Sequence, residues 1–91
     1  MNAQLEAVRE QVDLLELVGR DVTLRRAGAR YRGLCPFHYE KTASFFVNPQ
    51  SKTWRCYGCR RSGDAFDWLM AREGLTFHQA VAALERELIV P

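Results

Sequence analysis

Apolar and polar residues alternate at helical spacing near the start of the chain. The apolar positions recur three or four residues apart, at Leu5, Val8, Val12, Leu15 and Val18. This spacing predicts an amphipathic helix with one buried face. Asp13 followed by Glu16 is typical of a capping box, which marks a helix start. The pattern leaves open a single helix or two short helices with a break near Val12, and in either case Gly19 ends it.

A period-two alternation replaces the helical spacing in the middle of the chain. Four segments show it, and their residue types favour strands. A turn over 27–29 joins the first two segments, and a turn over 48–51 that contains Asn48 and Pro49 joins the other two. The sequence therefore predicts two hairpins in a small antiparallel sheet, with strands at residues 22–25, 31–34, 44–47 and 53–56.

The last third of the chain predicts two more helices. After a loop over 60–63, Asp64 is a good N-cap and Gly74 a good helix stop. Thr76 with Gln79 predicts a capping box at the start of the final helix. Together these elements predict an α+β fold in one domain over residues 1–91, an antiparallel sheet of about four to five strands flanked by N- and C-terminal helices.

Two pairs of metal-ligand residues carry the clearest chemical signal. Cys35 and His38 are separated by two residues, as are Cys56 and Cys59, and 17 residues lie between the pairs. This spacing lets two tight turns direct four ligands to one zinc ion, as in a zinc ribbon. Three thiolates and an imidazole fill a tetrahedron and leave no position for a catalytic water. We therefore expect one structural zinc ion, and no catalytic residue in this chain.

Other uses of the cysteines explain the sequence less well. Buried apolar cysteines would not need the ligand spacing, and a redox role for Cys56 and Cys59 would leave Cys35 and His38 unexplained. The N-terminus lacks the features of a signal peptide, and no apolar run approaches the roughly 20 residues that span a bilayer. We expect a cytoplasmic protein with no membrane contact, where reduced thiols favour metal binding over disulfides.

Charge is segregated along the chain, although the formal net charge is only +2. Residues 20–61 hold ten of the 13 lysines and arginines but two of the 11 acids, which gives +8 there and −6 in the flanks. Such a basic zone, interleaved with aromatic residues, favours nucleic-acid binding, whereas a solvated basic face is the alternative. The candidate contact residues are Arg25, Arg26, Arg30, Tyr31, Arg32, Lys41, Lys52, Trp54, Arg55, Arg60 and Arg61.

Two considerations narrow these candidates. Strand alternation places Lys52 and Trp54 on one face of the predicted sheet and Thr53, Arg55 and Tyr57 on the other, so both faces cannot bind the same strand. Three thiolates around one divalent ion also give a site of formal charge −1. Arginines close to it in sequence therefore have a structural explanation as well, namely Arg55, Arg60 and Arg61.

Ordered motifs along nearly the whole chain resemble the zinc-binding domain of bacterial and phage primases, the CHC2 zinc-finger family. The matching runs are 12–19, 24–28, 35–38, 40–42, 44–45, 56–59, 63–66 and 77–81. The resemblance implies the same four zinc ligands and basic contacts at Arg25, Arg26 and Arg30, with Lys41 in the matching Glu-Lys-Thr run. The chain departs from the family pattern at Ala43, where proline is usual, and at Arg60 and Arg61, where small residues are usual.

The resemblance also implies a function. It predicts a DNA primase module that holds single-stranded DNA template and helps select where an RNA primer begins during DNA replication, in a bacterial or phage-infected cell. The partner would be an RNA polymerase domain in cis or in trans, with a replicative helicase as a further candidate. The alternative is a zinc ribbon of a phage, plasmid or other mobile element that docks on replication or recombination proteins. Neither hypothesis makes this chain alone an enzyme, since no Gly-rich phosphate loop or acidic magnesium cluster is evident.

Overall fold

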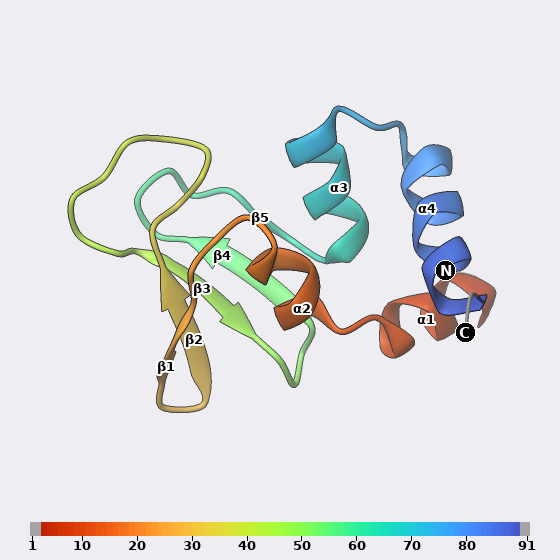
Figure 1. Cartoon of the computed structure of the whole chain (residues 1–91), viewed down its shortest axis with the longest axis horizontal. Coiled ribbons are helices and arrows are strands. Elements are labelled where there is room, and N and C mark those ends of the chain that lie inside the picture. The colour runs from red at the N-terminus through yellow and green to blue at the C-terminus, as the bar shows by residue number, and fades with distance from the viewer. Residues whose placement is uncertain (1–2, 90–91) are drawn as a thin grey trace.

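The computed structural model describes residues 3–89, in which helices flank an antiparallel sheet. The helices are α1 (Ala3–Gln11), α2 (Leu14–Gly19), α3 (Ala65–Glu73) and α4 (Phe77–Ile89). In Figure 1 the sheet forms one half of the molecule and α1, α3 and α4 the other, with α2 between them. The predicted α+β architecture is confirmed. None of the described helices is long and apolar enough to cross a membrane.

The N-terminal helical segment consists of two helices, which settles the question that the sequence left open. The Asp13 side chain accepts a hydrogen bond from the Glu16 backbone N–H at 3.2 Å, and so caps α2. Val12 lies between the two helices and is buried. Because of this break, the apolar faces of both helices pack into the same core.

The sheet has five strands in sequence order, and every neighbouring pair is antiparallel. The two predicted hairpins are present, but the first strand begins at Arg25 rather than at Val22, which is buried in the core instead. The predicted loop over 60–63 is also wrong in part, because its last two residues pair with the fourth strand. The strands are β1 (Arg25–Ala27), β2 (Arg30–Gly33), β3 (Phe45–Asn48), β4 (Thr53–Cys56) and β5 (Ser62–Gly63).

Predicted capping residues fix the two ends of α3 and the start of α4. Asp64 and Asp67 exchange reciprocal side chain to backbone bonds of 3.0 Å at the start of α3, and Gly74 ends it with a φ of 68°. Thr76 and Gln79 form the expected capping box before α4, with bonds of 2.9 and 3.2 Å. Helix α3 thus begins and ends at defined residues, and it packs against β5.

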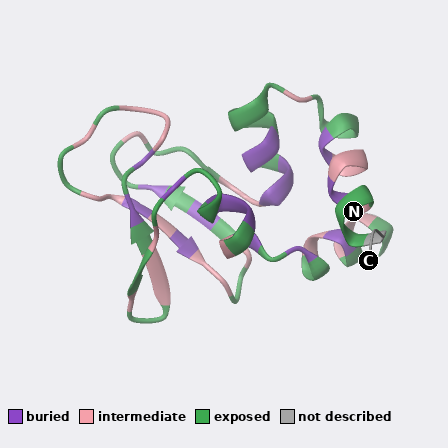
Figure 2. Cartoon of the chain, viewed as in Figure 1, coloured by how far each residue is buried: buried purple, intermediate pink, exposed green. Residues whose placement is uncertain are grey.

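One aromatic cluster joins the helices to the sheet. Trp54 of β4 packs edge-on against Trp68 of α3 at 5.4 Å between ring centroids, and Phe45 of β3 stacks on Trp54 at 5.8 Å. The Phe45 side chain is fully buried, as the sequence predicted. Figure 2 shows buried residues on the side of the sheet and helices where these elements meet. The opposite side of the sheet therefore faces solvent, and we call it the open face.

Candidate metal centre and basic sheet face

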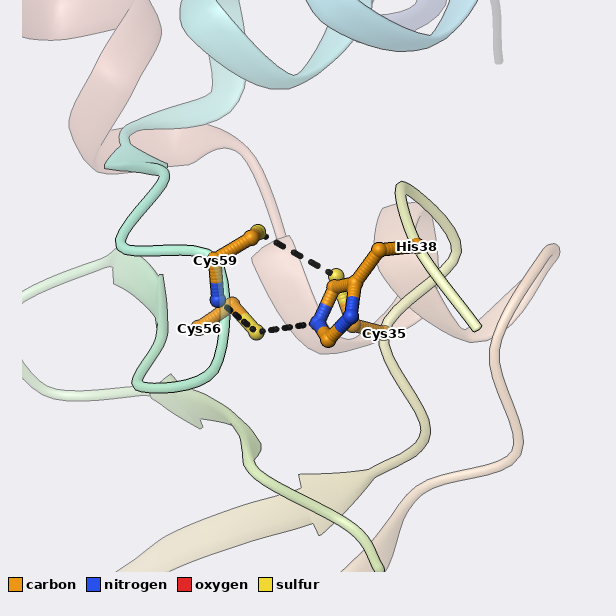
Figure 3. Close-up of side chains that lie close together, drawn as sticks. All are labelled: Cys35, His38, Cys56 and Cys59. Atoms are coloured by element: carbon orange, nitrogen blue, oxygen red, sulfur yellow. Dashed lines mark hydrogen bonds between the residues drawn. The ribbon is translucent and has the colours of Figure 1, made fainter. Parts of the chain in front are cut away.

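The four predicted ligands converge at one end of the sheet. Cys56 is the last residue of β4, Cys35 lies two residues beyond β2, and the connecting turns bring His38 and Cys59 beside them. The ligand atoms all lie within 4.8 Å of one another. Figure 3 shows the three sulfurs and the imidazole directed at a common point.

The spacing of the ligand atoms fits a tetrahedral zinc ion. Zn–S and Zn–N bonds of about 2.3 and 2.05 Å give tetrahedral edges of about 3.8 Å for S···S and about 3.6 Å for S···N. The Cys35 and Cys59 Sγ atoms are 3.8 Å apart, and His38 Nε2 is 3.3 Å from Cys56 Sγ. A soft donor set of three sulfurs and one nitrogen also favours zinc over hard cations such as magnesium.

The ligands differ in how readily they ionise. Burial raises the pKa of the Cys35 thiol to about 12. Burial also opposes ionisation of Cys56, but the hydrogen bond from the Cys59 N–H and the contacts with the Ser44 hydroxyl and the His38 ring outweigh it and lower the pKa of the Cys56 thiol to about 6. The adjacent Cys56 sulfur raises the pKa of His38. Cys56 therefore ionises more readily than Cys35, which must lose a proton to bind a metal ion.

Glu40 holds the first ligand turn in place, a role that the sequence analysis did not assign. Its carboxylate accepts the Cys35 backbone N–H at 2.8 Å and the Ser44 backbone N–H at 3.1 Å, and it also accepts the Ser44 hydroxyl. The side chain is only 9% exposed. Burial opposes its ionisation, but these donors outweigh burial and lower the pKa of Glu40. Its position two residues after His38 in the Glu-Lys-Thr run was the only signal in the sequence.

A glycine allows the two ligand turns to approach each other. A Cβ at Gly58 would lie 2.8 Å from His38 Cε1 and 2.9 Å from the Ser44 hydroxyl, closer than side chains tolerate. The Tyr57 N–H donates to the Ser44 carbonyl at 2.9 Å, which ties the second turn to the segment before β3. The ligand geometry thus depends on contacts between the turns as well as on the metal.

Phe37 connects the metal-ligand turns to the aromatic core. Its ring lies 5.6 Å from Trp54 and 5.5 Å from Trp68, between centroids. The guanidinium of Arg61 lies over the Phe37 ring, 4.8 Å from its centroid. Arg61 therefore has a structural contact next to the ligands, but with an aromatic ring rather than with the charge of the thiolates.

The open face carries most of the predicted basic contacts. Arg25 pairs directly with Arg32, Arg32 with Phe46, and Phe46 with Arg55, so one row of side chains crosses four strands. Directly paired residues of antiparallel strands share a face. Arg25, Arg32 and Arg55 are exposed, and Phe46 is half-buried. The open face is therefore strongly basic and contains an aromatic ring.

A second row on the open face combines cations with aromatic rings. The Arg30 guanidinium lies 4.2 Å from the centre of the Phe46 ring, and its Nη1 donates to the Tyr57 hydroxyl at 3.1 Å. Arg55 lies 5.1 Å from the Tyr57 ring, which is 53% exposed. These side chains line a shallow pocket of about 150 Å³. Phe46 and Tyr57 are among the aromatic residues that interleave with the basic zone in the sequence, and strand alternation had placed Tyr57 on the same side as Arg55.

Some predicted contacts lie away from the open face. The ring of Trp54, one of the candidate contacts, is only 3% exposed and its indole N–H donates to the Asp64 carbonyl at 2.9 Å, so Trp54 belongs to the core. Lys52 is half-buried and donates to the Val12 carbonyl at 2.8 Å. Arg26 and Tyr31 pair with each other on the side opposite the open face.

Arg25 and Arg32, with Arg26, also line a larger hollow at the base of the β1–β2 hairpin. Its volume is about 730 Å³, and Leu34 and Ala43 contribute apolar surface. Lys41 is exposed in the loop after Glu40, and Arg60 is exposed after Cys59. The basic surface therefore extends from the hairpin across the open face, with further cations in the two ligand turns.

Comparisons with known proteins agree with this architecture. The chain is 44% identical to a DNA primase of Listeria monocytogenes over 77 residues, and 46% identical to a DNA primase of Myxococcus xanthus over 85 residues. These alignments cover 85% and 93% of this chain but only 12% and 14% of the relatives, so the chain matches a small part of each.

A solved structure shows the same fold. The crystal structure of the Aquifex aeolicus primase, with zinc-binding and RNA polymerase domains, matches 96% of this chain and 22% of that chain, with a TM-score of 0.87 and 29% identity. A family model described as the CHC2 zinc finger matches residues 1–90, which include all four ligands. On the strength of that match, of the curated relatives and of the converging ligands, this chain belongs to the CHC2 zinc finger family.

Proposed function

We propose that this chain is the zinc-binding module of a DNA primase and that it holds single-stranded DNA template on its open face. The single observation that carries the proposal is the row of Arg25, Arg32, Phe46 and Arg55 across the sheet. Arginines neutralise phosphates, and exposed rings stack on unpaired bases, which is the combination that single strands require. A solvent-exposed sheet face suits a strand whose bases are splayed out.

In this proposal the metal ion is one structural zinc. It closes the two ligand turns and so fixes the end of β4 from which Arg55 and Tyr57 project. Four protein ligands leave no coordination position for substrate, so nucleotide transfer belongs to an RNA polymerase domain, in cis or in trans. Placement of the template on the open face would then help to set where a primer begins.

Salt-dependent binding to single-stranded DNA tests this function. The zinc-loaded chain is titrated into a fluorescent oligonucleotide at several salt concentrations, alongside Arg30→Ala and Arg55→Ala variants. Three to four phosphate contacts predict a slope of log K against log salt of about −2 to −3. Arg86→Ala on α4 removes the same charge far from the open face in sequence and fold, and serves as the control.

The outcomes separate the proposal from its main alternative. Steep salt dependence that decreases in the Arg30 and Arg55 variants, while zinc content stays unchanged, supports template binding. A folded, zinc-loaded chain that does not bind single-stranded DNA even at low salt contradicts it. That result would favour a module that docks on another protein, for example on a polymerase, helicase or recombinase.

A further inference from the structure

Two residues other than glycine have a positive φ in the described part of the chain. Lys52 has a φ of 58° and Arg60 a φ of 68°. This region is unfavourable for residues with a Cβ, and glycine occupies it without that penalty. A non-glycine residue in such a conformation therefore needs a compensating contact, either within the protein or with a ligand.

For Lys52, contacts within the fold compensate for the unfavourable φ. It ends the turn between β3 and β4, where its N–H donates to the Asn48 carbonyl at 2.9 Å. Its half-buried side chain crosses to the break between α1 and α2 and donates to the Val12 carbonyl at 2.8 Å. The amino group thus satisfies a carbonyl where α1 ends, which glycine could not do.

Arg60 has no comparable side-chain contact. Its backbone closes the second ligand turn, since its N–H donates to the Cys56 carbonyl at 2.8 Å and the next carbonyl, of Arg61, accepts the Cys56 N–H at 2.8 Å. These bonds hold the backbone at positive φ whatever the side chain. The side chain is exposed, and among residues 3–89 it has no hydrogen bond, ion pair or ring contact. The fold needs this backbone conformation but makes no use of the guanidinium.

The position of Arg60 next to the open face indicates a binding role for its guanidinium. Arg60 precedes β5 by two residues, and Ser62 of β5 pairs directly with Arg55 of the open face. A strand that lies across the open face and passes Arg55 and Tyr57 would therefore reach the second ligand turn next. The guanidinium of Arg61 is less available to such a strand, because it lies over the Phe37 ring.

We propose that Arg60 is a phosphate-binding residue that extends the path of the single strand beyond the sheet, and that its unfavourable backbone conformation is retained for this contact. The inference rests on the proposed function, because it assumes that the open face holds a single strand. It adds one specific expectation: a substitution of Arg60 by glycine should stabilise the fold but weaken binding to single-stranded DNA.

The test compares Arg60→Gly and Arg60→Lys with the unaltered, zinc-loaded chain. Urea unfolding measures stability, and titration with a fluorescent oligothymidylate at several salt concentrations measures binding. Arg60→Gly should raise the urea midpoint, weaken binding about three- to tenfold, and make the salt slope shallower by about 0.7, the value for one phosphate contact on a single strand. Arg60→Lys keeps the charge and should stay near the unaltered chain in both measurements.

Each result supports or overturns the inference. Arg86→Ala controls for loss of one positive charge and should leave binding unchanged. If Arg60→Gly lowers the urea midpoint, Arg60 stabilises the ligand turn, for example by offsetting the charge of the thiolates, and the inference is wrong. If the unaltered chain binds and Arg60→Gly binds equally well, the inference alone is wrong. If the unaltered chain does not bind the oligonucleotide, the proposed function is wrong and the inference with it.

Discussion

The two faces of the sheet are built from the same strands but obey different requirements. On the covered face, Phe45, Val47 and Cys56 are completely buried, and they form part of the core and the metal centre. On the open face, Arg25 stands directly opposite Arg32, and like charges in such a pair destabilise a sheet. The residues of the covered face stabilise the fold, whereas the facing arginines of the open face do not. Because these like charges lower the stability of the sheet, their presence favours a polyanionic ligand on the open face.

Metal removal should have the largest effect on stability, because the metal centre is part of the covered face. Structural zinc binding contributes on the order of 10 kcal/mol of apparent free energy, and a chain of this size buries too little apolar surface to replace it. A chelator, or a Cys56→Ser substitution, should therefore unfold the chain. Phe37 packs between the ligands and both tryptophans, so tryptophan fluorescence should report the transition. Unchanged fluorescence and circular dichroism after complete metal removal would contradict a structural role.

Neighbouring phenylalanines on opposite faces offer a matched pair of substitutions. Phe45→Ala should lower the free energy of unfolding by about 3–5 kcal/mol, as expected for a large core side chain. Phe46→Ala should lower it by less, but should weaken binding to single-stranded DNA by about 1–3 kcal/mol, the usual value for loss of a stacked base. Urea unfolding and oligonucleotide titration of both variants measure this difference. Equal losses of stability would show that the open face is as important to the fold as the core.

Acid should weaken zinc binding, because the ligands must lose protons. The Cys35 thiol has a pKa of about 12 and holds its proton at neutral pH, and the pKa of His38 is also raised, so the apparent affinity should fall as the pH is lowered. The pKa of Cys56 is about 6, so its proton adds to the loss only below that pH. Competition with a chromophoric chelator from pH 8 to about 5.5 measures the slope. An affinity that does not change with pH would contradict this ligand set.

The smallest expected effect comes from the arginine pair of the open face. Arg32→Thr removes one of two like charges that face each other on β1 and β2, and it should raise the free energy of unfolding by about 0.2–1 kcal/mol. The same substitution should weaken binding to single-stranded DNA, because a phosphate contact is lost. Thermal unfolding and titration, with Arg86→Ala as the control, give both values. A destabilised variant would show that Arg32 is kept for the fold.

Local chemistry determined which features could be predicted from the sequence. The four ligands and the caps at Asp64 and Thr76 were predictable, because each depends on residue types at a fixed short spacing. Glu40 was not, because a carboxylate that accepts backbone N–H groups needs only a loop of suitable shape and has no periodic signature. Strand β5 is too short to show alternation.

The errors in the sheet have a similar cause. Alternation at 22–25 suggested a strand because Val22 and Leu24 are both apolar, but these residues pack against the core at the edge of the sheet before β1 begins. Alternation also divided the residues around Trp54 correctly between two faces. It could not show which face the helices cover, because that depends on how distant elements pack, so the sequence could not decide whether Trp54 is a core residue or a contact.

The most direct test of the account is to observe which face of the sheet meets single-stranded DNA. In an NMR titration of the zinc-loaded chain with an oligothymidylate, the ring signals of Phe46 and Tyr57 and the side-chain signals of Arg30 and Arg55 should shift. The indole signals of Trp54 and Trp68, which lie on the covered side, should stay in place. Shifts that are concentrated on α1 and α4, while the open face stays unchanged, would contradict the central claim that the open face is the template-binding surface.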